Sequence, residues 1–290
     1  MTVTRSATLP ALALVFNAFT WGVSWWPFRQ LSALGLHPLW ATVFIYALAL
    51  MLITLWRPGA WRDLARTPTL WLLVLASGTT NATFNWAVTI GDVVRVVLLF
   101  YLMPLWAVLL ARLLLHEPIT RGAMLRVGLA LLGAAIVLWP AQGGLPLPHS
   151  LAEWLAVLGG LSFALNNVML RREAQRPEAA RALAMFLGGT AVAGVLAVSL
   201  AAQGLVAAPP ALAPGWVLGA LLMGGAFLLG NMALQHGAAR LPANVTAVIM
   251  VTEVLFASVS AVLLGAGSVT PALALGGALI VGATLLSARA

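Results

Sequence analysis

Polar side chains recur at helical spacing inside long apolar stretches of this 290-residue chain. Ser77, Asn81 and Asn85 follow one another at i, i+4 and i+8, which places them on one face of a helix. Their amide and hydroxyl groups both donate and accept hydrogen bonds, so they could hold the polar group of a small solute. The same residue types also join helices to each other in membranes, and that role stays open. The full set is Asn17, Thr20, Ser77, Asn81, Asn85, Asn166, Asn167 and Asn231.

One acidic residue, Glu253, lies far from the end of its apolar stretch. Ionisable residues in such positions usually face the interior of a helix bundle or a water-filled path. Its carboxyl group could carry a coupling proton or pair with the ammonium group of a substrate. A hydrogen-bonded packing residue is the alternative. We predict that Glu253 belongs to both the substrate-binding and the coupling residues.

Aromatic residues fall into two groups along the chain. Most Trp residues lie near the ends of apolar stretches, which is typical of the aromatic belt at a membrane surface. Trp21, Trp86, Tyr101 and Phe163 lie deeper and share stretches with polar residues or with other candidate residues. Their rings could stack on an aromatic side chain or on a planar cation. We therefore add these four to the candidate substrate-binding residues.

Three further residues are candidates for gating. Asp92 and Arg95 flank the start of one apolar stretch, either as a surface ion pair or as an external gate. Pro104 lies inside the same stretch, where it removes a backbone hydrogen bond and predicts a kink.

The composition decides which elements can position these residues. Apolar residues make up 62% of the chain and charged residues 8%, whereas soluble domains carry roughly 25% charged residues. This excludes a soluble enzyme and a nucleic-acid-binding module. There is no Cys and no Lys, and none of the four His lies beside a mid-span Ser or acid. We therefore expect no enzyme activity, no cofactor and no bound metal.

Ten apolar stretches are each close to the length of about 20 residues that crosses a bilayer as a helix. The connections between them are short, so an all-α integral membrane protein with ten transmembrane helices is predicted. The stretches cover 9–28, 38–56, 69–90, 94–115, 122–140, 151–170, 182–202, 214–236, 243–264 and 272–288.

The arginines support this count and give an orientation. If the N-terminus is cytoplasmic and ten helices follow, only Arg29 and Arg95 lie on the outer side. An excess of positive charge on the cytoplasmic side is the rule for membrane proteins. We expect a bacterial-type inner membrane protein with both termini in the cytoplasm. The cytoplasmic side would carry Arg5, Arg57, Arg62, Arg66, Arg112, Arg121, Arg126, Arg171, Arg172, Arg176, Arg181, Arg240 and Arg289.

The two halves of the chain contain similar short motifs in the same order. Asn85-Trp86-Ala87 corresponds to Asn231-Met232-Ala233, and Gly128 and Gly133 correspond to Gly277 and Gly282. We assign residues 1–143 and 144–290 to two repeats of five helices. Because five is odd, the repeats must have opposite orientations, an architecture found in transporters with a central binding site.

The stretch from Asn85 to Arg95, together with Tyr101 to Glu117, resembles the EamA-type branch of the drug/metabolite transporter superfamily. Within the branch the chain looks most like the YddG-type exporters of aromatic amino acids. The resemblance implies two inverted five-helix repeats around a central cavity lined by helices 1, 3, 4, 6, 8 and 9. One difference is Val254 after Glu253, where the branch often has Pro, so a flexible ninth helix is not expected from proline.

Two transport functions fit these observations. The first is a secondary transporter that exports amino acids, most of all Phe, Tyr and Trp, by alternating access. The alternative is an efflux transporter for lipophilic cations or other small metabolites. In either case the partners are a small-molecule substrate and the lipid bilayer, with no nucleic acid, and we expect a monomer.

Overall fold

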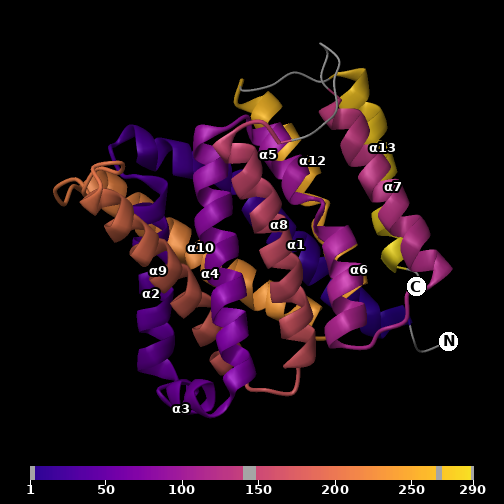
Figure 1. Cartoon of the computed structure of the whole chain (residues 1–290), viewed down its shortest axis with the longest axis horizontal. Coiled ribbons are helices and arrows are strands. Elements are labelled where there is room, and N and C mark those ends of the chain that lie inside the picture. Colours follow the sequence, from indigo (N-terminus) through magenta and orange to yellow (C-terminus); the bar gives the residue numbers. More distant parts are fainter. Residues whose placement is uncertain (1–3, 140–147, 266–269, 289–290) are drawn as a thin grey trace.

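The computed structural model describes residues 4–139, 148–265 and 270–288, and within these ranges the regular structure is helical throughout (Figure 1). Long apolar sequences without alternation favour helices, because every backbone group is then hydrogen-bonded within its own segment. The helices are α1 (Thr4–Ala33), α2 (Pro38–Trp56), α3 (Gly59–Arg66), α4 (Pro68–Ile90), α5 (Val93–Phe100), α6 (Met103–Leu114), α7 (Arg121–Leu138), α8 (Leu151–Arg172), α9 (Glu178–Ala202), α10 (Pro214–Ala238), α11 (Ala243–Met250), α12 (Glu253–Leu263) and α13 (Pro271–Ala288).

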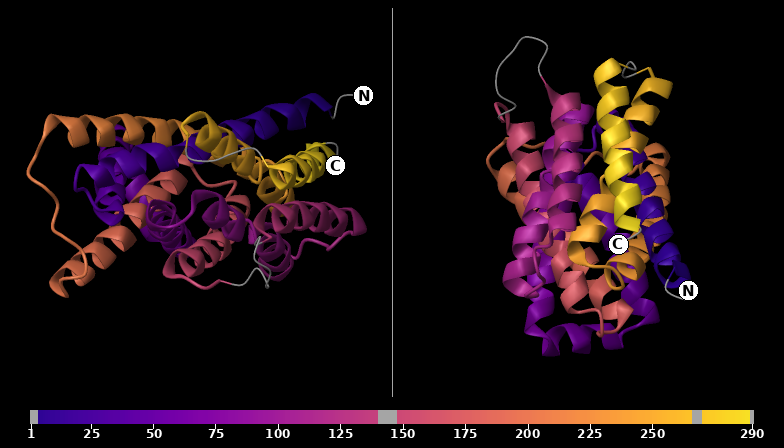
Figure 2. Two further views of the ribbon diagram at one scale, coloured as in Figure 1. Left: turned by 90° about the horizontal axis from the view of Figure 1, so that it is seen from above. Right: turned by 90° about the vertical axis from the view of Figure 1, so that its right-hand side faces the viewer.

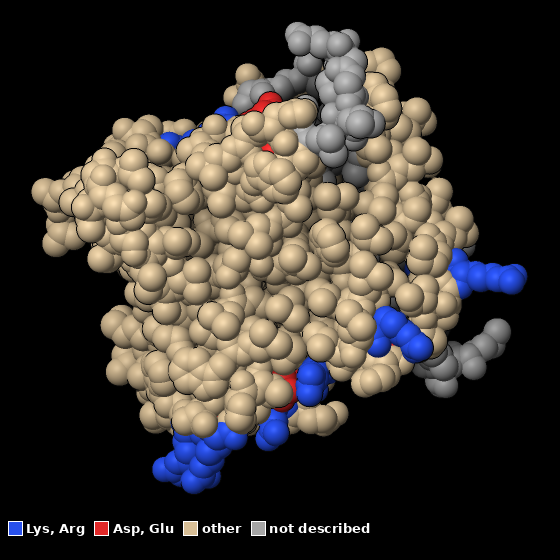
Figure 3. All heavy atoms as spheres, in the orientation of Figure 1, with Lys and Arg blue, Asp and Glu red and all other residues tan. Residues whose placement is uncertain are grey.

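Several helices have the length and composition of membrane spans. Among the described residues, α2, α8, α9 and α10 are long and apolar enough to cross a membrane. Most of the basic side chains visible in Figure 3 lie from the lower left of the molecule to its right-hand edge, and the remaining charged side chains lie near the top. A wide band without charged side chains separates these two groups in this view. Such a band is what a protein surrounded by hydrocarbon presents to lipid.

Two predicted spans are broken in the middle. The fourth is divided into α5 and α6 by a turn at Tyr101 and Leu102, and the ninth into α11 and α12 by a turn at Val251 and Thr252. Pro104 lies in the first turn of α6, as the predicted kink requires. The second break occurs without proline. There, Thr252 donates its hydroxyl hydrogen to the Ile249 carbonyl at 2.9 Å, and this bond satisfies an acceptor in the turn.

The two halves of the chain pack against each other in matching pairs. Helix α4 packs against α8, and α10 packs against α1. Likewise α6 contacts α8, and α12 contacts α1. Helices α7 and α13 lie side by side at one edge of the bundle (Figure 2). Each of these contacts between the halves therefore has a counterpart, in which the corresponding helix of the other half takes part: α4–α8 matches α10–α1, and α6–α8 matches α12–α1.

Glycine permits the closest of these helix crossings. A Cβ atom on Gly188 of α9 would lie 2.0 Å from the Val74 carbonyl oxygen of α4, and one on Gly78 of α4 would lie 2.4 Å from the Gly188 carbonyl oxygen. On α8, a Cβ atom on Gly160 would lie 2.2 Å from the carbonyl oxygen of Phe100, at the end of α5. Small residues are common at helix contacts in membranes because they let two backbones approach closely.

Candidate substrate-binding cavity

A central cavity is surrounded by helices from both halves of the chain. The empty space between its atoms, including the part that opens to the outside, is about 510 Å³. Rings, amides and one carboxyl group make up most of its wall. The lining residues are Asn17, Trp21, Tyr46, Ser77, Thr80, Asn81, Phe84, Phe100, Phe163, Asn166, Met185, Phe186, Phe227, Asn231, Leu234 and Glu253.

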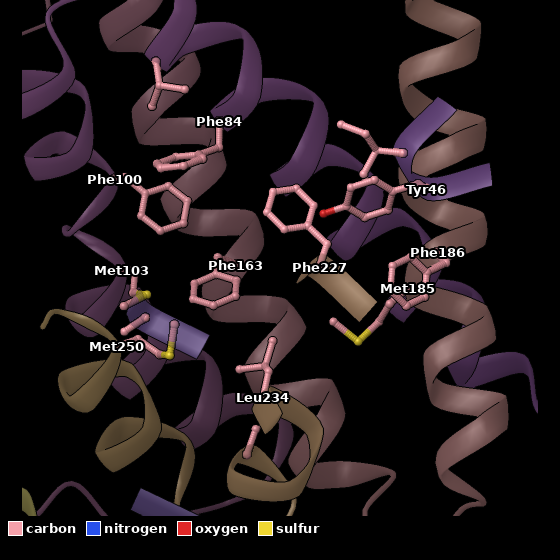
Figure 4. Packing of buried hydrophobic residues seen from close by; sticks show 14 of the residues in the cluster. Tyr46, Phe84, Phe100, Met103, Phe163, Met185, Phe186, Phe227, Leu234 and Met250 are labelled. Carbon is pink, nitrogen blue, oxygen red and sulfur yellow. The ribbon is translucent and has the colours of Figure 1, made fainter. Parts of the chain in front are cut away.

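The rings form two groups that Trp21 joins, because its ring lies 5.7 Å from Phe84 and 4.6 Å from Phe227, between ring centroids. Phe84, Phe100 and Phe163 form one group, in which the Phe100 ring lies 4.7 Å from Phe84 and 5.5 Å from Phe163, between ring centroids. In the other group, Phe227 stacks on Trp21 with centroids 4.6 Å apart, and Tyr46 lies beside it (Figure 4). Neighbouring aromatic rings attract each other beyond their burial. A planar ligand against these rings would gain the same kind of contact.

The amides in the wall are held in place by neighbouring helices. The Asn17 side chain on α1 donates its amide hydrogen to the Gly230 carbonyl of α10 at 2.7 Å. The Asn81 amide donates to the Ser77 carbonyl of its own helix at 2.7 Å and accepts from the hydroxyl of Tyr46. On α10, Asn231 accepts a hydrogen bond of 2.8 Å from the side-chain amide of Gln235. These bonds fix the direction of each amide before any ligand binds.

Other polar atoms of the wall have no hydrogen-bond partner among the described residues. They are both side-chain polar atoms of Asn166, Oδ1 of Asn17 and Oε1 of Glu253, and all three residues are almost completely buried. A buried polar group without a partner costs about 1–3 kcal/mol. Hydrogen bonds from water or from a polar ligand in the cavity would remove this cost.

Glu253 is the first residue of α12, directly after the break that follows α11. Its carboxyl group lies beside the phenol of Tyr101, with which it interacts. A Cβ atom on Gly22 of α1 would lie 2.8 Å from the Glu253 carbonyl oxygen, so α1 packs closely against this turn. The acid is therefore held at the break, and its side chain lines the cavity.

The structure brings eight of the predicted substrate-binding residues together in the cavity wall. These residues come from α1, α4, α8, α10 and α12, far apart in the sequence. They are Asn17, Trp21, Ser77, Asn81, Phe163, Asn166, Asn231 and Glu253.

The other five predicted residues lie outside this wall. Asn85 donates its amide hydrogen to the Thr42 hydroxyl of α2 at 2.8 Å, so it joins two helices. Thr20 donates to the Phe16 carbonyl of its own helix at 3.1 Å. For these two positions, the packing alternative describes the structure better than the binding one.

Trp86, Tyr101 and Asn167 also lie outside the wall. Trp86 packs beside a small cluster of Ala and Leu residues on α2, α4 and α9. Tyr101 is buried between the broken spans and donates its hydroxyl hydrogen to the Met250 carbonyl. Asn167 is buried, and neither polar atom of its side chain has a partner among the described residues.

The predicted gating residues are only partly described. Asp92 is exposed between α4 and α5, and the neighbouring Gly91 carbonyl accepts a hydrogen bond of 3.0 Å from Arg29. The side chains of Arg95 and Pro104 lie outside the described part of the structure. The ion pair predicted for Asp92 and Arg95 stays a prediction.

Half of the cavity wall was not predicted from the sequence. Tyr46 of α2 and Met185 and Phe186 of α9 place two helices in the wall that carry no stripe of polar residues. Tyr46, one of only two tyrosines and deep within an apolar stretch, was the available signal. The remaining members that the sequence analysis missed are Thr80, Phe84, Phe100, Phe227 and Leu234.

A groove lies next to the cavity, between α2, α3, α9 and α10. Its empty volume, counting open solvent, is about 2030 Å³. Gln235 lines this groove and bonds to Asn231, which lines the cavity. A single pair of hydrogen-bonded side chains on α10 thus connects the two spaces.

Part of the chain is similar to known transporters. Residues 8–139 match the model of the EamA-like transporter family. The chain is 31% identical over 138 residues to an uncharacterized transporter of Pseudomonas aeruginosa. That alignment covers 46% of this chain and 42% of the relative, so the chain aligns with less than half of the relative's length. Together with the long apolar helices, these matches indicate a multi-pass membrane protein.

A solved crystal structure shares the fold over almost the whole chain. The two agree with a TM-score of 0.73 at 19% identity, over 98% of this chain and 96% of the other. At this identity the likeness concerns the fold alone. The likeness in fold also covers the second half of the chain, which lies beyond residues 8–139.

Proposed function

We propose that the protein is a secondary transporter that exports small organic solutes with an amino group and an aromatic side chain, foremost Phe, Tyr and Trp. The similarity of residues 8–139 to the EamA-like transporter family supports transport. The composition of the central cavity supports the class of substrate. The observation that carries the proposal is Asn166, which lines a cavity walled by rings and whose two side-chain polar atoms have no partner in the described part of the chain.

An amino acid fits the polar groups of the wall as follows. Its ammonium group would donate to the Glu253 carboxylate and to the unpartnered oxygen of Asn17. Its carboxylate would accept from the Asn166 amide nitrogen. An aromatic side chain would then pack against the rings of the wall, among them Phe163 and Phe227, gaining about 0.5–1.5 kcal/mol per ring pair beyond its burial.

A lipophilic organic cation is the second candidate substrate. Among the described residues, the cavity wall contains one carboxyl group, that of Glu253, and no basic side chain. A charged carboxylate among aromatic rings attracts a cation through both its charge and the ring faces. A zwitterion carries in addition a carboxylate that only amides can hold. Because a cation has no such carboxylate, it matches the single acidic group of the wall, and we keep it as the alternative substrate.

For the mechanism, we propose alternating access between two inverted repeats, residues 1–143 and 144–290. The matching contacts between the halves and the two broken spans support this arrangement. Broken helices in corresponding positions of two halves are typical of transporters with a binding site near the middle of the membrane. The groove that ends at Gln235 would be the cytoplasmic path, with the Asn231–Gln235 pair as its inner barrier.

The proposed setting is a bacterial-type inner membrane with both termini in the cytoplasm and ten crossings. The distribution of arginines along the sequence supports it. We expect the protein to act as a monomer and not as an enzyme. Energy would come from a gradient, either by facilitated export or by a proton that Glu253 carries.

Thermal unfolding of the purified protein in detergent tests the substrate class. Aromatic amino acids, lipophilic cations and sugar phosphates would be compared as ligands, because a ligand that binds only the folded state raises the melting temperature. We expect stabilisation by aromatic amino acids and none by sugar phosphates. Glu253→Gln separates the two candidates, since it should abolish stabilisation by cations and only weaken that by amino acids. Stabilisation by neither class would contradict the proposal.

A further inference from the structure

Arg181 is a buried arginine at the start of α9, outside the central cavity. Its side chain is only 2% exposed. Its Nε and Nη1 atoms have no hydrogen-bond partner within the described ranges, and Nη2 lies 4.0 Å from a carboxylate oxygen of Glu178. A buried charge is costly unless it is paired and hydrogen-bonded. Two donor atoms of the guanidinium therefore lack a partner in the described ranges, and a further anion would satisfy them.

The guanidinium lines a basic pocket between the α8–α9 connection and the end of α10. The empty volume of the pocket, counting open solvent, is about 860 Å³, and Arg176 and Arg240 also line it. Arg240 is close enough to Arg181 for the two positive charges to repel each other. Glu178 lies at the pocket but its side chain is 64% exposed, so it screens this repulsion only weakly. An anion between the two arginines would turn the repulsion into attraction.

The backbone adds further positive potential at the same place. Helix α9 has 25 residues and begins at Glu178, and its N-cap residue, Pro177, makes no side-chain capping bond. The first amide groups of a helix point outward and attract anions. Pro177 and Glu178 line the basic pocket, so the start of α9 and the Arg181 side chain meet there.

An apolar groove continues from the basic pocket. Pro177 and Glu178 line both, and on the groove side they are joined by Leu52, Ile53 and Met232. Nearby, Trp56 is 72% exposed at the end of α2, as in the aromatic belts at membrane surfaces. A phosphate group and a hydrocarbon chain of one molecule could therefore bind in adjacent spaces.

We propose that this basic pocket binds the phosphate of an anionic phospholipid, with Arg181 and Arg240 as its main ligands and an acyl chain in the adjoining groove. Guanidinium groups match phosphate oxygens in geometry and bind them through two parallel hydrogen bonds. Basic pockets between helices at the cytoplasmic side suit such head groups. The phosphate site is separate from the central cavity, and the acyl chain would occupy the groove proposed above as the cytoplasmic path.

Native mass spectrometry of the purified protein in a neutral detergent tests this site. Phosphatidylglycerol, phosphatidylcholine and inorganic phosphate would be added separately. We expect phosphatidylglycerol to bind about ten-fold more tightly than phosphatidylcholine, and Arg240→Gln to lower this preference about five-fold, as one lost arginine contact implies. Arg181→Met should abolish the preference if that variant folds.

Arg62→Gln is the matched control, because Arg62 is an exposed arginine of α3, which packs against the same helix α9. We expect it to leave the lipid preference within about two-fold of the unchanged protein, since a charge outside the pocket contributes only screened attraction. An equal loss in Arg62→Gln and Arg240→Gln would overturn the site, as would equal binding of the two lipids. Displacement of phosphatidylglycerol by inorganic phosphate would support recognition of the phosphate group. Binding of inorganic phosphate without binding of phosphatidylglycerol would contradict a lipid as the ligand of this pocket.

Discussion

The hydroxyl of Tyr101 donates a hydrogen bond of 3.0 Å to the backbone carbonyl of Met250. Tyr101 lies in the turn between α5 and α6, and Met250 is the last residue of α11, before the turn that leads to α12. The bond therefore connects the broken span of the first half to that of the second. It also keeps the Tyr101 ring next to Glu253, at the edge of the cavity.

Tyr101→Phe should destabilise the protein because it leaves the Met250 carbonyl without its donor. We expect a loss of about 1–2 kcal/mol, measured as reversible unfolding in detergent. Thr190→Val is the control. Among the described residues the Thr190 hydroxyl bonds only to the Phe186 carbonyl of its own helix, so its loss should cost less. Equal losses in the two variants would show that the connection between the breaks has no special role.

Asn166 and Asn85 should respond in opposite ways to the same substitution. Asn166→Leu removes a side chain without hydrogen-bond partners among the described residues, so stability should stay the same or rise. Stabilisation by a ligand should be lost. Asn85→Leu removes the bond to Thr42 and should cost about 1 kcal/mol while the ligand response persists. A ligand response that survives in Asn166→Leu would contradict the assignment of the cavity.

Gly188 should not tolerate a side chain. In Gly188→Ala the new methyl group would lie about 2.0 Å from the Val74 carbonyl oxygen unless α4 and α9 move apart. Forcing extra atoms into such a contact typically costs about 1–3 kcal/mol. Gly225→Ala on α10 meets nothing within 4 Å and should be neutral or slightly stabilising. The melting temperatures of the two variants are compared with that of the unchanged protein. An unchanged melting temperature in Gly188→Ala would contradict the close packing of α4 against α9.

The proposed orientation can be tested by single cysteines, because the chain contains none of its own. Gln203→Cys, at the end of α9, should react with a membrane-impermeant thiol reagent added outside intact cells. Gln175→Cys, in the α8–α9 connection, should react only after the membrane is opened. Both positions are exposed in the structure, so access to the reagent is the only difference. The reverse pattern would invert the orientation inferred from the arginines.

The sequence predicted helices, their approximate limits and half of the cavity wall, because these depend on local patterns. Spacing could show that Asn81 and Asn85 share a helix face. It could not show that Asn81 bonds to Tyr46 of α2 and Asn85 to Thr42 of α2. The rings of Phe186 and Phe227 carry no polar signal, so only packing between helices identifies them. The break before Glu253 contains no proline that could predict it from the sequence. Its turn contains the hydrogen bond from the Thr252 hydroxyl to the Ile249 carbonyl.

Uptake of labelled Trp into vesicles containing the purified protein tests most directly whether the central cavity carries a substrate. We expect uptake above that of protein-free vesicles, retained in Asn85→Leu and lost in Asn166→Leu. Asn166 lines the cavity with polar atoms that have no partner among the described residues, whereas Asn85 lies outside the cavity wall. Labelled lipophilic cations would be measured in parallel. No flux above protein-free vesicles for any amino acid or cation, or full activity in Asn166→Leu, would contradict the account.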